Sequence, residues 1–299
     1  MRPLVLLALL LALAGCGGSN NAAEAPATTA APAPAPEPTK EDVFDFDRDA
    51  PLELTEGETS QKPEFTARAM SYASPGGDRV SGIVLVPDVE ERPAGVVFMH
   101  GAGGSRVDFL GDASELARSG AVTLTIDSPF SRSESEEIRA GAAPPDVIHD
   151  LMVQNVMDLV RGLDVLVQEY DADPDRLAVV GYSMGVQQAA IAAALDDRVG
   201  AVVLMAGRAE PSKTPGDTAW EELFRDIDTV RFLPDLGHAS VLVQGGRQDE
   251  VVPPAELEAL YAATSEPKEL RWYPAGHGLT PKAGRERVAW LREQLGLTN

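Results

Sequence analysis

The chain has 299 residues, a length that suits one large α/β domain once its ends are set aside. Apolar residues make up 44% of the sequence, close to the average of globular proteins, so a sizeable core can form. The formal net charge of −22 argues against nucleic acid or another polyanion as a partner, because the long-range field of the protein would repel it.

The N-terminus has the pattern of an export signal. A basic residue, Arg2, precedes an unbroken apolar run over residues 4–14. This run is too short to cross a bilayer core of ~30 Å as a permanent helix, but it suits the apolar part of a signal peptide. We therefore expect residues 1–15 to be removed on export, which places the rest of the protein outside the cytoplasm.

Residues 13–16 read Leu-Ala-Gly-Cys and resemble the lipobox of bacterial lipoproteins. The resemblance implies that Cys16 is lipidated, becomes the mature N-terminus and anchors the protein to a bacterial cell membrane, at the cell surface or in the periplasm. Two or more acyl chains, at ~0.8 kcal/mol per buried CH₂, give a stable anchor where one chain would not. Cys16 is the single cysteine of the chain, so it can form no disulfide within it. The alternative is an ordinary signal peptide that contains a cysteine.

Residues 16–40 are predicted to be a linker between this anchor and a folded domain over residues 41–299. The stretch 17–38 consists mainly of Ala, Pro, Thr, Ser and Asn. Such a composition buries too little apolar surface to offset the entropy of ordering the chain. We expect an extended tether that spans ~3.1 Å per residue.

The start of the folded domain has the acidic spacing of a calcium-binding loop. Asp45, Asp47, Asp49 and Glu56 fall on liganding positions of an EF-hand loop. Ala50, however, stands where the turn glycine of such a loop is needed, and no amphipathic helix precedes the segment. We therefore predict no metal and no cofactor.

The rest of the chain alternates short apolar runs with helical patterns. The predicted strands are 65–73, 79–86, 95–99, 122–126, 177–180, 201–205, 240–244 and 270–273. The predicted helices lie near 105–118, 147–170, 184–195 and 255–263, with a final one at the C-terminus. Antiparallel strands followed by alternating strands and helices, with almost continuously apolar strands, indicate an α/β fold. Its sheet should be mostly parallel and covered by helices on both faces.

One motif in this pattern carries chemistry. Residues 181–185 read Gly-Tyr-Ser-Met-Gly, a G-x-S-x-G motif, and they stand between a predicted buried strand and a predicted helix. In that setting a tight turn holds the serine hydroxyl above the sheet, and the flanking glycines avoid a clash with a Cβ atom. Ser183 is therefore the candidate nucleophile, and the N–H of Met184 is one candidate oxyanion donor.

A serine hydroxyl needs a base to take its proton and an acid to orient that base. His277 lies just after the last predicted strand, where the base of this kind of fold is found. Asp249 follows the preceding strand and is the candidate acid, with Glu250 as a poor second. Structural or surface roles are predicted for the remaining histidines, which are His100, His149 and His238. The N–H of Ala102 is the candidate second oxyanion donor, with Gly103 as the alternative.

Together these segments resemble the α/β-hydrolase superfamily, in particular its dienelactone-hydrolase-like and acetyl-xylan-esterase-like members. The resemblance covers about residues 60–299 and rests on five segments, which are His-Gly-x-Gly-Gly from 100, Asp-Ser-Pro from 127, the motif at 181–185, Gly-x-x-x-Asp-x-Val-Val-Pro from 245 and Gly-His-Gly from 276. It implies an α/β-hydrolase fold and a serine hydrolase. The expected activity is that of a monomeric carboxylesterase, which hydrolyses small-molecule esters through an acyl-enzyme.

Two positions depart from the pattern of these families. Ser183 stands where dienelactone hydrolases proper have Cys, and Val186 stands where relatives often have Gly.

An insertion at about residues 207–237 precedes the strand that leads to Asp249. Its apolar residues recur at helical spacing: Trp220, Leu223, Phe224, Ile227 and Val230. Either this helix packs against the edge of the sheet, or it forms a small lid over Ser183.

The sequence leaves two further functions open. One is a serine peptidase of the prolyl-oligopeptidase type, and the other is a non-catalytic surface lipoprotein that uses the fold for binding.

Overall fold

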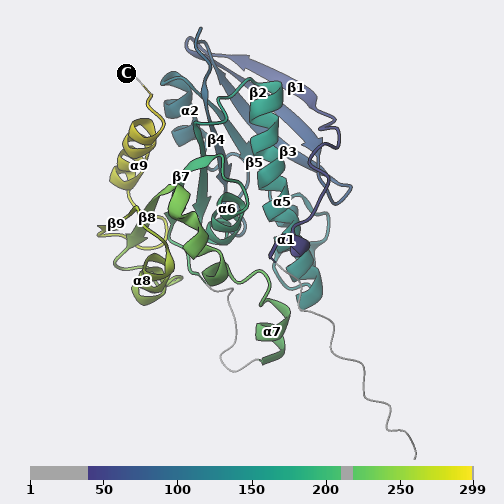
Figure 1. Ribbon diagram of the computed structural model, residues 1–299, viewed down its shortest axis with the longest axis vertical. Helices are drawn as coiled ribbons and strands as arrows, with labels where there is room; N and C mark the ends of the chain where they lie inside the picture. Colours follow the sequence, from purple (N-terminus) through teal and green to yellow (C-terminus); the bar gives the residue numbers. More distant parts are fainter. Residues whose placement is uncertain (1–39, 210–217, 298–299) are drawn as a thin grey trace, which may run out of the picture. The chain divides into compact units, whose positions relative to one another are not determined.

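The computed structural model describes residues 40–209 and 218–297 (Figure 1). The predicted lipidation site, Cys16, and most of the predicted linker lie outside the described residues. No helix within the described parts of the chain is long and apolar enough to span a membrane.

The described residues form a nine-stranded sheet with the order β1-β2-β3-β5-β4-β6-β7-β8-β9. Its strands are β1 (Thr55–Gln61), β2 (Phe65–Ala73), β3 (Arg79–Pro87), β4 (Ala94–Met99), β5 (Ala121–Ile126), β6 (Leu177–Tyr182), β7 (Val199–Met205), β8 (Ser240–Gly246) and β9 (Lys268–Tyr273). The pairs β1–β2, β2–β3 and β3–β5 are antiparallel, and every pair from β5 to β9 is parallel. The predicted antiparallel start and mostly parallel sheet are confirmed.

Helices cover both faces of this sheet (Figure 1). On one side, α5 (Pro145–Glu169) and α6 (Gly185–Ala194) pack against a cluster that includes Val97 of β4. On the other side, α2 (Leu110–Arg118) and α9 (Pro281–Gln294) pack against a cluster that includes Phe98, the next residue of β4. Successive side chains of a strand point to opposite faces, so a strand buried on both faces must be apolar throughout. This explains the continuous apolar runs in the sequence.

The structure adds elements that apolar periodicity does not indicate. Strand β1 is exposed along its whole length and reads Thr-Glu-Gly-Glu-Thr-Ser-Gln, so it carries no apolar signal. The helix expected at 105–118 begins only at Leu110. Short helical segments lie in the connections, which are α1 (Lys40–Val43), α3 (Pro129–Arg132), α4 (Glu136–Arg139), α7 (Thr218–Leu223), and the 3₁₀ turns η1 (Thr229–Arg231) and η2 (Leu233–His238). The remaining helix is α8 (Pro254–Ala263).

The acidic segment after α1 is attached to the domain by arginines. Arg48 of this segment donates to the carboxylates of Asp164 and Asp196, at 2.8 and 2.9 Å. The buried guanidinium of Arg161 donates to the backbone oxygens of Arg48 and Ala50. These contacts hold the segment on the C-terminal part of α5.

Candidate active site

Ser183 occupies a strained turn between β6 and α6. Its φ angle is +54°, in the left-handed region that costs a non-glycine residue energy. A Cβ atom on Gly181 would collide with the backbone oxygen of Gly185, and one on Gly185 would lie 2.7 Å from the backbone oxygens of His100 and Met99. Both glycines of the motif are therefore required by the close approach of backbone to backbone.

We expect Gly185→Ala to destabilise the protein and to lower its activity. The added methyl group would meet backbone atoms, which cannot rotate away, so overpacking should cost about 1–3 kcal/mol of unfolding free energy. Denaturant unfolding of the variant measures this loss. Gly200→Ala is the matched control, because no atom lies within 4 Å of the Cβ that it adds. Equal stability of the two variants would contradict the steric argument.

The structure brings Ser183, His277 and Asp249 into one chain of hydrogen bonds. The Nε2 atom of His277 lies 2.9 Å from Oγ of Ser183, which is 94 residues away in the sequence. Its Nδ1 atom lies 2.8 Å from Oδ2 of Asp249. With the proton on Nδ1 donated to the carboxylate, Nε2 is left to accept the hydroxyl proton of Ser183. The neighbouring Glu250 is exposed and does not take part in this chain.

The loop after β8 holds the carboxylate of Asp249 in place. The second oxygen of this carboxylate accepts hydrogen bonds from the backbone N–H groups of Val251 and Val252, both at 2.9 Å. The residue is 5% exposed. Because the oxygens of a buried carboxylate need hydrogen-bond partners, these two N–H groups hold the side chain of Asp249 in its orientation toward His277.

Tyr182, the variable residue of the motif before the serine, supports the histidine loop. Its hydroxyl donates to the backbone oxygen of His277 at 3.2 Å, and the two ring centroids lie 5.2 Å apart. Burial, together with the charges of Asp249 and Asp108, raises the pKa of the Tyr182 phenol, so that it stays a donor at neutral pH. No pattern in the sequence predicts this role, although the tyrosine stands inside the G-x-S-x-G motif.

The loop that carries Ala102 lies against the serine. A Cβ atom on Gly101 would lie 2.9 Å from the Cβ of Ser183, so the loop approaches as closely as a glycine allows. The buried ring of His100 fixes this loop, since Nδ1 donates to the backbone oxygen of Gly101 and Nε2 accepts from the backbone N–H of Ser128. The predicted structural role of His100 agrees with these contacts.

A cavity of about 390 Å³ opens beside Ser183. The predicted oxyanion residues Ala102 and Met184 line it, as does Gly103. Apolar side chains form much of the remaining wall, namely Phe130, Ile148, Met152, Trp220 and Val252. A larger hollow of about 870 Å³ lies between α2 and α9, but Ser183 does not line it. Of these two, the smaller cavity is the one that the candidate nucleophile lines.

The insertion at 207–237 contributes one wall of this cavity. Trp220 on α7 lines the cavity and stacks on Phe224, with ring centroids 4.0 Å apart. Phe224 and Ile227 are buried, and His149 on α5 contacts Asp226 at 3.0 Å. From residue 218 on, the insertion is thus packed against α5 while it also shapes the space next to Ser183.

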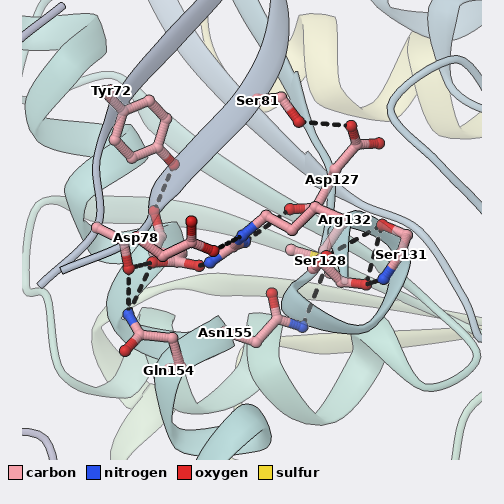
Figure 2. A network of polar contacts seen from close by, with 12 residues as sticks. Tyr72, Asp78, Ser81, Asp127, Ser128, Ser131, Arg132, Gln154 and Asn155 are labelled. Carbon is pink, nitrogen blue, oxygen red and sulfur yellow. Dashed lines mark hydrogen bonds and ion pairs between the residues drawn. The ribbon is translucent and has the colours of Figure 1, made fainter. Parts of the chain in front are cut away.

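A buried polar network holds the loop that supplies Phe130 to the cavity (Figure 2). The carboxylate of Asp158 is fully buried and accepts from Arg132 at 2.7 Å, from Gln154 at 2.9 Å and from Ser74 at 2.6 Å. Burial raises the pKa of Asp158, although the charge of Arg132 opposes this effect. Nearby, Asp127 accepts from the hydroxyl of Ser81 at 2.7 Å. The network joins β3, α5 and the residue that follows β2 to residues 127–132, which include α3.

Groups of metal-ligating side chains are absent from the described residues. No cluster of three or more His, Cys, Asp or Glu side chains could hold a metal ion there. The acidic positions 45–49, which resemble an EF-hand in spacing, do not form one.

Comparison with known proteins agrees with this architecture. The acetyl xylan esterase 1 of Thermoanaerobacterium sp. JW/SL YS485 has a similar structure, with a TM-score of 0.71 at 19% identity over 85% of this chain and 92% of that one. The acetyl xylan esterase of Paenibacillus sp. R4 has a TM-score of 0.68 at 20% identity over the same shares. An esterase from an Arctic intertidal metagenomic library reaches 0.65 at 20% identity, over 81% of this chain and 98% of that one. These likenesses show the α/β-hydrolase fold.

The sequence itself matches a family model over most of the domain. The model is that of the dienelactone hydrolase family, and the match covers residues 80–290, from β3 to α9. This range contains Ser183, Asp249 and His277. The chain belongs to the dienelactone hydrolase family.

Proposed function

We propose that the protein is a serine carboxylesterase in which Ser183, His277 and Asp249 are the catalytic triad. The observation that carries the proposal is the continuous chain of 2.9 and 2.8 Å contacts from Ser183 through His277 to Asp249, beside a cavity that reaches the serine. Membership of a hydrolase family and the fold shared with esterases support it.

In the proposed reaction, Oγ of Ser183 attacks the ester carbonyl while Nε2 of His277 takes the hydroxyl proton. The N–H groups of Met184 and Ala102 stabilise the negative oxygen of the tetrahedral intermediate. His277 then gives its proton to the leaving alcohol, and an acyl-enzyme remains on Ser183. A water molecule, deprotonated by His277, attacks this acyl-enzyme; the bond to Oγ of Ser183 then breaks, His277 returns the proton to Oγ, and the carboxylic acid is released.

Labelling of the full-length protein with a fluorophosphonate probe tests this function. The probe phosphonylates an activated serine, so we expect one label, at Ser183. Turnover of p-nitrophenyl esters of graded chain length should accompany it, and turnover of peptidyl p-nitroanilides should be far slower. A preference for the anilides would favour the peptidase alternative. Absence of both labelling and turnover would favour a non-catalytic binding role.

We further propose that the enzyme works outside the cytoplasm on a lipid anchor at Cys16. The support is the apolar run at 4–14 and the lipobox-like sequence that ends at Cys16. The family match begins only at residue 80, so the anchor and the catalytic domain use separate parts of the chain.

Cys16→Ser should abolish membrane attachment and leave ester hydrolysis unchanged. The acyl chains supply most of the membrane affinity in this proposal, so without them the protein should leave the detergent phase on partitioning. Mass spectrometry of the mature N-terminus provides the direct measurement in a bacterial host. An unmodified Cys16 there would refute the anchor, while the roles of Ser183, His277 and Asp249 would be unaffected.

A further inference from the structure

The cavity beside Ser183 contains a buried amide in otherwise largely apolar surroundings. Gln187 lies in the first turn of α6, directly after the serine turn, and lines the cavity together with Phe130, Met152 and Trp220. The residue is 5% exposed. None of the described residues offers a hydrogen-bond acceptor to its Nε2 atom.

Among the described residues, two charged side chains line the cavity, and the protein already engages both. Arg139 donates to the backbone oxygen of Ser133 at 2.7 Å, and Arg208 donates to the backbone oxygen of Val251 at 2.7 Å. Gln187 differs from both, because its Nε2 atom has no acceptor among the described residues; this atom is also shielded from the cavity, so a substrate oxygen reaches it once the amide group turns over. A primary amide carries donors and an acceptor, which exchange places when the group turns over.

The position of the histidine indicates which part of an ester enters this cavity. The leaving alcohol must lie within reach of His277, which protonates it. His277 is not among the residues that line the cavity, whereas Ala102 and Met184, on the oxyanion side, are. The alcohol thus leaves on the histidine side, and the acyl chain extends into the cavity toward Gln187.

An unpaired amide in an apolar wall costs free energy that a matching substrate group recovers. A plain alkyl chain cannot hydrogen-bond to it, whereas a chain with an ether, hydroxyl or second carbonyl oxygen can. On the basis of the proposed esterase function, we propose that Gln187 determines acyl specificity, and that the enzyme prefers esters whose acyl chain carries an oxygen over esters of plain alkanoic acids.

The test compares acyl chains of equal length on the full-length protein. The substrates are p-nitrophenyl pentanoate and its two oxygen-containing analogues, the ethoxyacetate and the 3-methoxypropanoate. The variant is Gln187→Met, which keeps the side-chain volume and removes the amide. For at least one analogue, the ratio of its kcat/KM to that of the pentanoate should fall about tenfold in the variant, the size expected for one buried hydrogen bond.

The comparison is built so that other effects cancel. The intrinsic reactivity of each ester is the same for wild type and variant, and a ratio within one preparation does not depend on the fraction of folded enzyme. Gln188→Met is the matched control: Gln188 is also buried, with an unpaired Oε1 among the described residues, but it does not line the cavity, so its ratios should equal those of the wild type.

Two results would overturn the proposal. In the first, the kcat/KM ratios of both analogues to the pentanoate stay within twofold of wild type in Gln187→Met. The amide would then not discriminate between acyl chains, and the esterase function would be unaffected. A wild-type protein that hydrolyses none of the three esters would remove the esterase function and the specificity together.

Discussion

Ser183→Ala is expected to abolish ester hydrolysis, with kcat lower by about 10⁶-fold. The alanine lacks the oxygen that attacks the ester, while the cavity and the oxyanion donors stay in place. The activity that remains should therefore be the small rate that binding and oxyanion stabilisation provide without a nucleophile. Turnover of a p-nitrophenyl ester under saturating substrate measures the loss.

The other two members of the chain of hydrogen bonds give a graded series in the same assay. His277→Ala should be about as damaging as the serine change, because the three groups act as a unit. Asp249→Asn should be milder and still cost about 10⁴-fold, since an amide favours the wrong imidazole tautomer. Glu250→Gln is the matched control for this change and should leave kcat unchanged. Wild-type turnover in Ser183→Ala would refute the mechanism.

Arg132→Met is expected to lower the free energy of unfolding by about 3–5 kcal/mol at neutral pH, the largest loss among the variants proposed for this protein. The carboxylate of Asp158 has no exposed surface, and Arg132, itself 8% exposed, is its ionic partner at 2.7 Å. Methionine would leave a buried charge whose remaining side-chain hydrogen bonds among the described residues come from Ser74 and Gln154, both to Oδ1. Denaturant unfolding monitored by circular dichroism measures the change.

The same variant should show a characteristic pH dependence. Burial raises the pKa of Asp158 in the folded protein above its ordinary value, and loss of the arginine removes the main opposing charge. In the folded variant, Asp158 therefore binds a proton more readily than it does in the unfolded chain. The loss of unfolding free energy relative to wild type should be complete at pH values above this raised pKa. This difference in unfolding free energy should shrink as the pH falls through that pKa toward about 3.9, the ordinary pKa of an aspartate.

Arg118→Met is the control for this prediction. Arg118 is 43% exposed and pairs with the exposed Glu115 at 2.9 Å, so its removal should cost less than about 1 kcal/mol. A deficit in Arg132→Met that is equally small, or one that does not change as the pH falls, would contradict the account of a buried charge.

Much of the fold could be predicted because its signals are local. The strands β4 to β8 are short apolar runs, since helices cover both faces of the sheet, and the motif at 181–185 needs only a strand before it and a helix after it. Strand β1 escaped prediction because an exposed edge strand can be polar at every position. The α7 and 3₁₀ segments of the insertion replace the single helix that its spacing suggested.

By itself, the sequence determined which residues carry the proposed chemistry, because Ser183, Asp249 and His277 each follow a strand of the parallel sheet in the order that the fold requires. Only the tertiary structure decided what surrounds them. Two contacts join segments that no periodic pattern connects: that of Tyr182 with His277 and that of Arg132 with Asp158. The place of Gln187 in the cavity wall likewise depends on the distant segments that form the rest of that wall. Polar side chains leave no regular trace along a chain, and their partners depend on which distant segments the folded sheet brings together.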